Sequence, residues 1–149
     1  MRLSTDRFSV AAYAVVENNR GEVLLTRRRG HEDWVLPGGS VEEEEAPWEA
    51  VVREVHEETG LDVALDRLVG VYAKRRERDL VFVFMASVTG GELRESDERD
   101  RASFVDPREL PEQTSNSDRR RIGDALEARM TAVLAIQPSH GDDPPPGTR

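Results

Sequence analysis

The sequence predicts a mixed α/β fold, and two observations lead to this prediction. Runs rich in β-branched and aromatic residues, typical of strands, occur on both sides of a stretch with helical periodicity that begins after Pro47. The chain has 149 residues, a length that suits one domain with a proper core, which we place at residues 1–137. Pattern alone does not give the order of the strands, so it predicts the class and no more.

The first third of the chain is typical of a β-hairpin. Residues 8–16 resemble a strand, residues 18–21 resemble a turn, and residues 22–27 resume a strand. A loop follows, and Trp34 then leads into the segment 37–39, whose two glycines permit a close backbone approach.

The central helix has clear signals at both ends. Pro47 is tolerated in a first helical turn, and Gly60 suits the left-handed conformation just beyond a helix C-terminus. At about 100° per residue, one apolar face of this helix should face the core. That face comprises Trp48, Val51, Val52 and Val55. Ala50, with its small side chain, should leave the neighbouring face open for a ligand.

Further strands are expected after the central helix. Residues 68–73 and 80–88 have strand character, residues 90–91 form a Gly-Gly turn, and residues 103–105 add a short strand.

A second helix is predicted from residue 117 to about residue 135, with Ser117 as its cap. The residues at core-facing spacing are Ile122, Leu126, Met130, Val133 and Leu134. Residues 138–149 hold four of the eight prolines together with Gly, Ser and Asp, which predicts a disordered tail.

Three glutamates gather at the end of the central helix. Glu54, Glu57 and Glu58 are three and four residues apart, so they share a face. Their charges repel one another and oppose the negative end of the helix dipole, so loss of one charge should stabilise the metal-free protein. Hard divalent cations take carboxylate oxygens, and Mg²⁺ uses a few carboxylates together with substrate phosphates. A solvated acidic helix face is the alternative interpretation.

Residues 39–61 fit the pattern G-x5-E-x7-R-E-U-x-E-E-x-G-U, with U aliphatic, without a mismatch. The matching positions are Gly39, Glu45, Arg53, Glu54, Val55, Glu57, Glu58, Gly60 and Leu61. The chain therefore resembles the Nudix hydrolases, and this agreement favours a functional role for the glutamates. The resemblance implies the Nudix fold, an α/β/α sandwich with a mixed sheet.

The resemblance also implies a reaction. Water would attack a phosphorus of a nucleoside diphosphate linked to another group, X, and release a phosphomonoester. The implied ligands of Mg²⁺ or Mn²⁺ are Glu54, Glu57, Glu58 and the carbonyl oxygen of Gly38. Arg53 is expected to pair with a glutamate such as Glu54, and Glu45 to brace the loop before the helix.

The acidic segment that contains Glu95, Asp97, Glu98 and Asp100 resembles the region that supplies a further metal ligand or the base in many Nudix enzymes. Alignment of Phe104 with the aromatic residue of that region points to Glu98, with Glu95, Asp97 and Asp100 as competitors. A plain acidic loop is the alternative. The general base stays open among Glu54, Glu57 and Glu98.

Basic and aromatic residues supply the candidate substrate contacts, which are Arg27, Arg28, Trp34 and Tyr72. Strand alternation should point one or two of the arginines at 27–29 toward phosphate and the rest toward solvent. Trp34 either stacks on a base or packs in the core. Tyr72 and Lys74 either contact substrate or end a solvated hairpin beside the basic run at 75–78. The histidines at 31, 56 and 140 receive no site assignment.

Composition restricts the partners. The net charge of −9 disfavours a nucleic-acid duplex or an anionic membrane, and no apolar run has the length of a membrane span. The absence of cysteine excludes thiol catalysis and thiolate metal ligands. We therefore expect a cytoplasmic protein that binds a small nucleotide, either as a monomer or as a homodimer.

The substrate is less well defined. Residues 72–98 and 109–127 resemble a branch described as ADP-ribose-pyrophosphatase-like, although no proline lies between Pro47 and Pro107, where such enzymes often carry one. We therefore favour a nucleoside-diphosphate-linked substrate. A nucleoside triphosphate, normal or oxidised, is the close alternative, and a non-catalytic nucleotide-binding regulatory domain is the alternative from another class. The complete set of acidic residues in the motif disfavours the last.

Overall fold

The computed structural model describes residues 7–97, 99–127 and 130–138, so the predicted tail lies outside the described residues except for Pro138. In chain order the described elements are β1 (Ser9–Glu17), β2 (Val23–Arg28), β3 (Trp34–Val35), β4 (Gly38–Ser40), α1 (Pro47–Thr59), β5 (Leu61–Lys74), β6 (Asp79–Gly91), β7 (Arg99–Val105), α2 (Asn116–Leu126) and β8 (Val133–Ile136). Neither described helix is long and apolar enough to cross a membrane.

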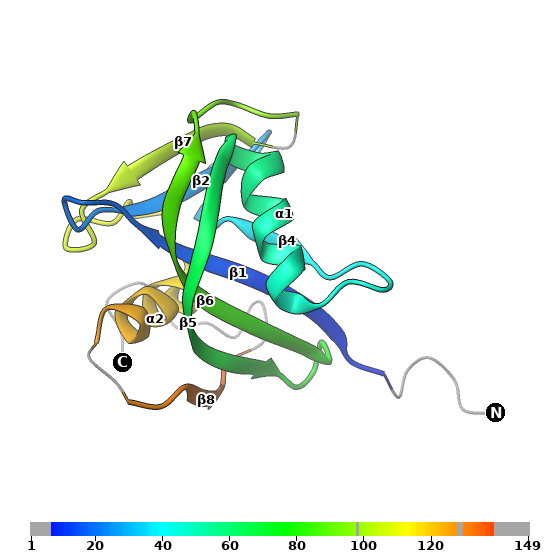
Figure 1. The fold of residues 1–149 in the computed structure, drawn as a ribbon. Helices are drawn as coiled ribbons and strands as arrows, with labels where there is room; N and C mark the ends of the chain where they lie inside the picture. The colour runs from blue at the N-terminus through cyan, green and yellow to red at the C-terminus, as the bar shows by residue number, and fades with distance from the viewer. Residues whose placement is uncertain (1–6, 98, 128–129, 139–149) are drawn as a thin grey trace.

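The strands form one mixed sheet (Figure 1). Its main path runs β3-β2-β1-β6-β5-β8, while β4 pairs with β1 and β7 pairs with β2. The β1–β6 and β5–β8 pairs are parallel, and the other pairs are antiparallel. The predicted α/β class with a mixed sheet is therefore confirmed.

A helix covers each face of the sheet. Alternation along β1 sends Ala14 into an apolar cluster with Val51 and Val55 of α1. Its neighbour Val15 points the other way, into a cluster with Ile122 of α2. Figure 1 shows the strands running between the two helices. The arrangement is the predicted α/β/α sandwich.

Helix α1 has the predicted ends, from Pro47 in the first turn to a left-handed Gly60 with φ of 80°. Two of its expected side-chain positions are wrong. Trp48 is 58% exposed, because α1 packs on the sheet through its later turns, where Val51 and Val55 are fully buried. Ala50 is also fully buried, so it does not leave an open face.

The sheet differs from the predicted hairpins in two places. β1 and β2 pair only at Glu17 and Val23, after which β2 pairs with β3 and with the whole of β7. Gly90 and Gly91 are not a turn, because they extend β6 and pair with β5. The glycine at 91 serves close packing: a Cβ there would lie 2.2 Å from the carbonyl oxygen of Gly60.

The second helix is shorter than predicted. It ends at Leu126, and its cap is Ser115, whose Oγ accepts the backbone N–H of Asp118 at 3.1 Å. Residues 133–136 form the edge strand β8, with Val133 buried and Leu134 82% exposed. Met130 is fully exposed, so its side chain does not face the core as the helical spacing in the sequence predicted. A short apolar run fits the periods of helix and strand equally well, which explains the error.

Candidate active site

The double-glycine segment passes between β1 and the end of α1. The backbone N–H of Gly38 donates to Oε1 of Glu58 at 2.8 Å. A Cβ at Gly38 would lie 2.2 Å from the carbonyl oxygen of Ala12, and one at Gly39 would lie 2.9 Å from Cδ of Glu54. Position 38 therefore needs glycine, because a Cβ there would clash with the backbone of β1, whereas a Cβ at Gly39 would displace the Glu54 carboxylate.

Arg53 joins three glutamates of the motif. Its Nη1 donates to Glu54 Oε1 at 3.1 Å and to Glu57 Oε2 at 3.2 Å. Its Nε and Nη2 donate to the two carboxylate oxygens of Glu45 at 2.7 and 3.0 Å. These bonds raise the pKa of Arg53 and lower the pKa of Glu45 to about 2. The geometry matches the orienting role expected of Arg53 and the bracing role expected of Glu45.

Glu58 has a different partner, which sequence reasoning missed. Its side chain is 1% exposed, and Oε2 lies 2.6 Å from Nη2 of Arg99. The guanidinium of Arg99 also donates from Nε to Thr26 Oγ1 at 3.2 Å. Arg99 begins β7 and is paired with Arg28 of β2, beside a bulge at Arg27 and Arg28. No sequence signal showed that pairing, because these strands are separated by about half of the chain.

The donor chemistry at this end of α1 fits a hard divalent cation. Glu54 and Glu57 converge on the same nitrogen of Arg53, and Glu54 faces the backbone at Gly39. Carboxylate and carbonyl oxygens are the ligands that Mg²⁺ prefers. In the described side-chain arrangement no three acidic groups lie close enough together to hold an ion. Arg53 pairs with Glu54 and Glu57, and Arg99 pairs with Glu58, which offsets the repulsion expected from the sequence.

Three of the cavities in the described part of the chain are considered for the site. The central cavity, of about 660 Å³, is lined by Tyr13, Arg28, Arg29, Gly38, Gly39, Ser40, Glu54, Asp97 and Arg99. The Trp34 cavity, of about 470 Å³, shares Tyr13, Arg28 and Arg99 with the central cavity. The Arg94 cavity, of about 480 Å³, is lined by Arg29, Glu57, Arg94, Glu95, Ser96 and Asp97. It shares Arg29 and Asp97 with the central cavity, so the central cavity lies between the other two.

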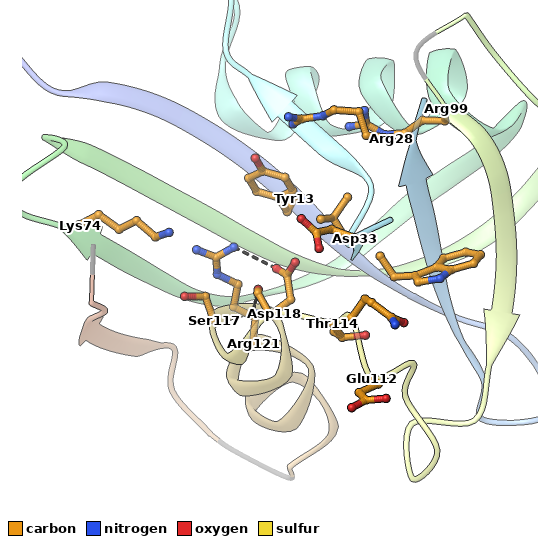
Figure 2. Close-up of a pocket in the computed structure, with 14 residues that line it drawn as sticks. Tyr13, Arg28, Asp33, Lys74, Arg99, Glu112, Thr114, Ser117, Asp118 and Arg121 are labelled. Carbon is orange, nitrogen blue, oxygen red and sulfur yellow. Dashed lines mark hydrogen bonds and ion pairs between the residues drawn. The ribbon is translucent and has the colours of Figure 1, made fainter. Parts of the chain in front are cut away.

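The Trp34 cavity has a polar wall supplied by α2 (Figure 2). Asp118 accepts from Arg121 Nη1 at 3.0 Å, and the Arg121 guanidinium lies over the ring of Tyr13 at 5.6 Å. Burial raises the pKa of Asp118, although Arg121 opposes this shift, and burial also raises the pKa of Tyr13. Figure 2 shows Arg28 and Arg99 on the opposite side, toward α1. The cavity thus has hydrogen-bonding groups on one side and two guanidinium groups on the other.

The structure separates the four predicted substrate residues. Arg28 and Trp34 line the Trp34 cavity. Tyr72 is wrongly assigned, because its side chain is fully buried in the core and its hydroxyl donates to Asp124 at 2.7 Å. The guanidinium of Arg27 donates to both carboxylate oxygens of Asp100, at 3.0 and 3.1 Å.

The predicted base Glu98 lies outside the described residues. Among its competitors, Asp97 lines the central cavity and Glu95 lines the Arg94 cavity. The pKa of Asp100 is lowered by its bond to Arg27, which fits a structural role. Arg29 donates to the carbonyl oxygens of Ser96 and Asp97 at 2.9 and 3.2 Å, and so ties the acidic segment to the end of β2.

The α/β/α sandwich and the glutamates that converge beside the double glycine of β4 are found together in one class of hydrolases, as the comparisons with known proteins show. The chain belongs to the NUDIX domain family, whose family model matches residues 7–126. It is 38% identical over 132 residues to a MutT-like protein of Streptomyces ambofaciens, covering 89% of this chain and 86% of that protein. It is 35% identical to a putative 8-oxo-dGTP diphosphatase of Bacillus subtilis, covering 89% of each.

Other similarities extend the comparison. An ADP-ribose pyrophosphatase of Methanocaldococcus jannaschii is 39% identical over 111 residues, which cover 69% of this chain and 64% of that protein. The crystal structure of an ADP-ribose pyrophosphatase from Streptococcus suis superposes with a TM-score of 0.74 at 23% identity, covering 87% of this chain and 98% of that one. A NUDIX hydrolase from Nitrosomonas europaea has a TM-score of 0.75 at 20% identity, covering 89% and 80% of the two chains.

These comparisons confirm the predicted fold and enzyme class. The protein is a Nudix hydrolase that cleaves a diphosphate linkage. Enzymes of this family act on small nucleotide substrates and generally use divalent metal ions.

Proposed function

We propose that this hydrolase cleaves a nucleoside diphosphate linked to a second group, X, with Mg²⁺ or Mn²⁺ as cofactor. The row of three adjoining cavities carries this proposal. The central cavity contains Glu54 and the glycine backbone, and space adjoins it on both sides. A diphosphate held in the middle would thus have room for a nucleoside at one end and for X at the other.

The lining of each cavity supports this placement. The Trp34 cavity offers an indole for stacking and polar groups such as Asp118 for a base edge. Arg28 and Arg99, which line the boundary with the central cavity, suit phosphate oxygens through their bidentate forks. The Arg94 cavity has a mixed polar lining, with Ser96 and Glu95 beside its arginines, which fits a hydroxylated X such as a sugar.

Each residue of the site would have its own role in metal binding or catalysis. Glu54, Glu57 and the carbonyl oxygen of Gly38 would hold the ion, with Glu58 as a further ligand. When bound, such an ion neutralises diphosphate charge and activates water. Arg53 orients Glu54 and Glu57 through Nη1. Removal of the proton from the attacking water is assigned to Glu54, Glu57 or Glu98.

A nucleoside triphosphate is the second candidate substrate. It is favoured by the similarity over 89% of the chain to the putative 8-oxo-dGTP diphosphatase. Its phosphate tail would extend from the central cavity into the Arg94 cavity, where Arg29 and Arg94 suit phosphate.

A nucleotide panel tests the function. ADP-ribose, nucleoside-diphosphate sugars, normal triphosphates and 8-oxo-dGTP would be incubated with Mg²⁺, with Mn²⁺ or with EDTA, and the products separated by anion-exchange chromatography. We expect the highest kcat/KM for a diphosphate-linked substrate, with a nucleoside monophosphate and X-phosphate as products. Release of pyrophosphate from a triphosphate at a higher kcat/KM would select the second candidate. Full turnover in EDTA would contradict the metal assignment.

The remaining assignments are also proposals. We propose a cytoplasmic protein with one domain at residues 1–137, which binds neither nucleic acid nor membrane, because its net charge of −9 repels both. A homodimer is compatible with the sequence, and light scattering of the purified protein would decide between monomer and dimer.

A further inference from the structure

Arg99 and Glu58 form a buried ion pair inside the site. The two side chains are 7% and 1% exposed, and Arg99 Nη2 lies 2.6 Å from Glu58 Oε2. The other oxygen of this carboxylate, Oε1, accepts the Gly38 N–H at 2.8 Å. One oxygen therefore accepts a backbone hydrogen bond, and the other forms an ion pair with a side chain.

A buried carboxylate needs a positive partner at all times. Removing a charge from water is costly, and the cost is offset only by a close opposite charge and hydrogen bonds. The guanidinium of Arg53 donates to Glu45, Glu54 and Glu57. The guanidinium of Arg99, at 2.6 Å, supplies a close positive charge to Glu58.

We propose that Arg99 and the divalent ion compete for Oε2 of Glu58, so that Arg99 sets the metal affinity of the site. This inference rests on the proposed function, because it takes the ion to bind at the glutamates of α1. In the metal-free enzyme Arg99 takes the place of the ion as the counter-charge of Glu58. When the ion binds, it displaces the guanidinium from Oε2.

The position of Arg99 gives the displaced guanidinium a new partner. Its side chain lines both the central cavity and the Trp34 cavity, where the diphosphate and the nucleoside are placed. A phosphate oxygen offers the same charge and the same bidentate geometry as a carboxylate. Arg99 is therefore a positioning residue for Glu58 before the ion binds and becomes a phosphate contact afterwards.

Metal affinity tests the competition directly. Mn²⁺ would be titrated into the protein without substrate and the free ion followed by electron paramagnetic resonance, for wild type, Arg99→Met and Arg101→Met. Arg101 is an exposed neighbour on β7, so its variant loses the same charge without touching Glu58. We expect Arg99→Met to bind Mn²⁺ about tenfold more tightly than wild type, because no guanidinium has to be displaced. Arg101→Met should match wild type to within about twofold.

Stability gives a second readout. Without metal, Arg99→Met should melt at a lower temperature than wild type, because the Glu58 carboxylate is buried without its counter-charge. Saturating Mn²⁺ should raise its melting temperature by more than it raises that of wild type, as tighter binding requires. A merely structural role for Arg99 would lower the melting temperature without tightening Mn²⁺ binding.

The outcomes separate this inference from the proposed function. Unchanged or weaker Mn²⁺ binding by Arg99→Met, with normal binding by wild type, would overturn the competition and leave the proposed function intact. If wild type itself did not bind Mn²⁺, both would be overturned. Should Arg99→Met fail to fold, Thr26→Val decides, because it removes the Nε partner of Arg99 and keeps the charge. It should tighten Mn²⁺ binding by about twofold to threefold, and an unchanged affinity would overturn the inference.

Discussion

Arg53 and Glu45 form a two-point ion pair, with Nε to Oε2 at 2.7 Å and Nη2 to Oε1 at 3.0 Å. Oε1 of Glu45 also accepts the backbone N–H of Glu42 at 3.0 Å, so the pair ties the loop before α1 to the middle of the helix. The same guanidinium holds Glu54 and Glu57 through Nη1. The loop and two glutamates of the site are therefore coupled through one side chain.

This pair predicts a specific loss of stability in acid. The bonds from Arg53 lower the pKa of Glu45 from its ordinary 4.5 to about 2. Because the folded-state pKa is the lower one, the stabilisation is fully present above about pH 4.5 and is lost as the pH falls toward 2. Melting temperatures of wild type and Glu45→Gln should therefore differ at neutral pH and converge on acidification. A difference that stays constant down to pH 2 would refute the linkage, because it would not depend on the charge of Glu45.

The exposed face of α1 predicts a contrast between Glu57 and Glu49. Glu57→Gln removes a proposed metal ligand, so turnover should fall by at least about tenfold. The loss of its half-exposed pair with Arg53 should cost only about 0.3–0.5 kcal/mol in the free energy of unfolding. Glu49→Gln keeps an acceptor for the Ala46 N–H, which Glu49 Oε1 now binds at 3.0 Å, so both activity and stability should stay close to wild type. Steady-state kinetics and urea titration measure both quantities, and equal loss of turnover in the two variants would show that the wrong helix face was assigned.

Glu58 should behave differently from Glu57. The acidic pattern alone suggests that loss of a charge relieves repulsion and raises the melting temperature of the metal-free protein. The structure predicts the opposite, because Glu58→Gln leaves the buried Arg99 without its carboxylate. Breaking a buried pair from one side costs about 3–5 kcal/mol, so this variant should be markedly destabilised in urea titration without metal. A melting temperature above wild type would mean that repulsion outweighs the ion pair.

Local signals in the sequence explain which parts of this structure could be predicted. Pro47 and Gly60 define α1 because each acts through its own backbone conformation, which does not depend on distant residues. The strand β8 was not predicted, because the run around Val133 becomes a strand only through its parallel pairing with β5. The ion pair of Arg99 and Glu58 was missed for the same reason: β7 reaches α1 only after it has paired with β2.

Substitutions of the two aromatic candidates for substrate contact should have different effects on KM. Tyr72→Phe removes the hydroxyl bonded to Asp124 in the core, so it should cost about 1–2 kcal/mol in the free energy of unfolding and leave KM unchanged. Trp34→Leu removes the ring that lines the Trp34 cavity, so it should raise KM several-fold with little change in kcat. Both variants would be measured by urea titration and steady-state kinetics. A raised KM for Tyr72→Phe at normal stability would return that residue to the substrate site.

The last prediction compares Glu98, which precedes β7 in the sequence, with Asp100, which lies in β7. If Glu98 is the general base, Glu98→Gln should lower kcat by about 10²–10⁴ while Mn²⁺ affinity stays at the wild-type value. Asp100→Asn is the matched control, since it removes a nearby carboxylate that is bound to Arg27 and should affect stability more than turnover. The pH profile separates the two roles open to Glu98, because loss of a base removes the acidic limb of the kcat curve, whereas loss of a metal ligand is partly rescued by added metal. A wild-type rate for Glu98→Gln at every pH would assign the base to Glu54 or Glu57.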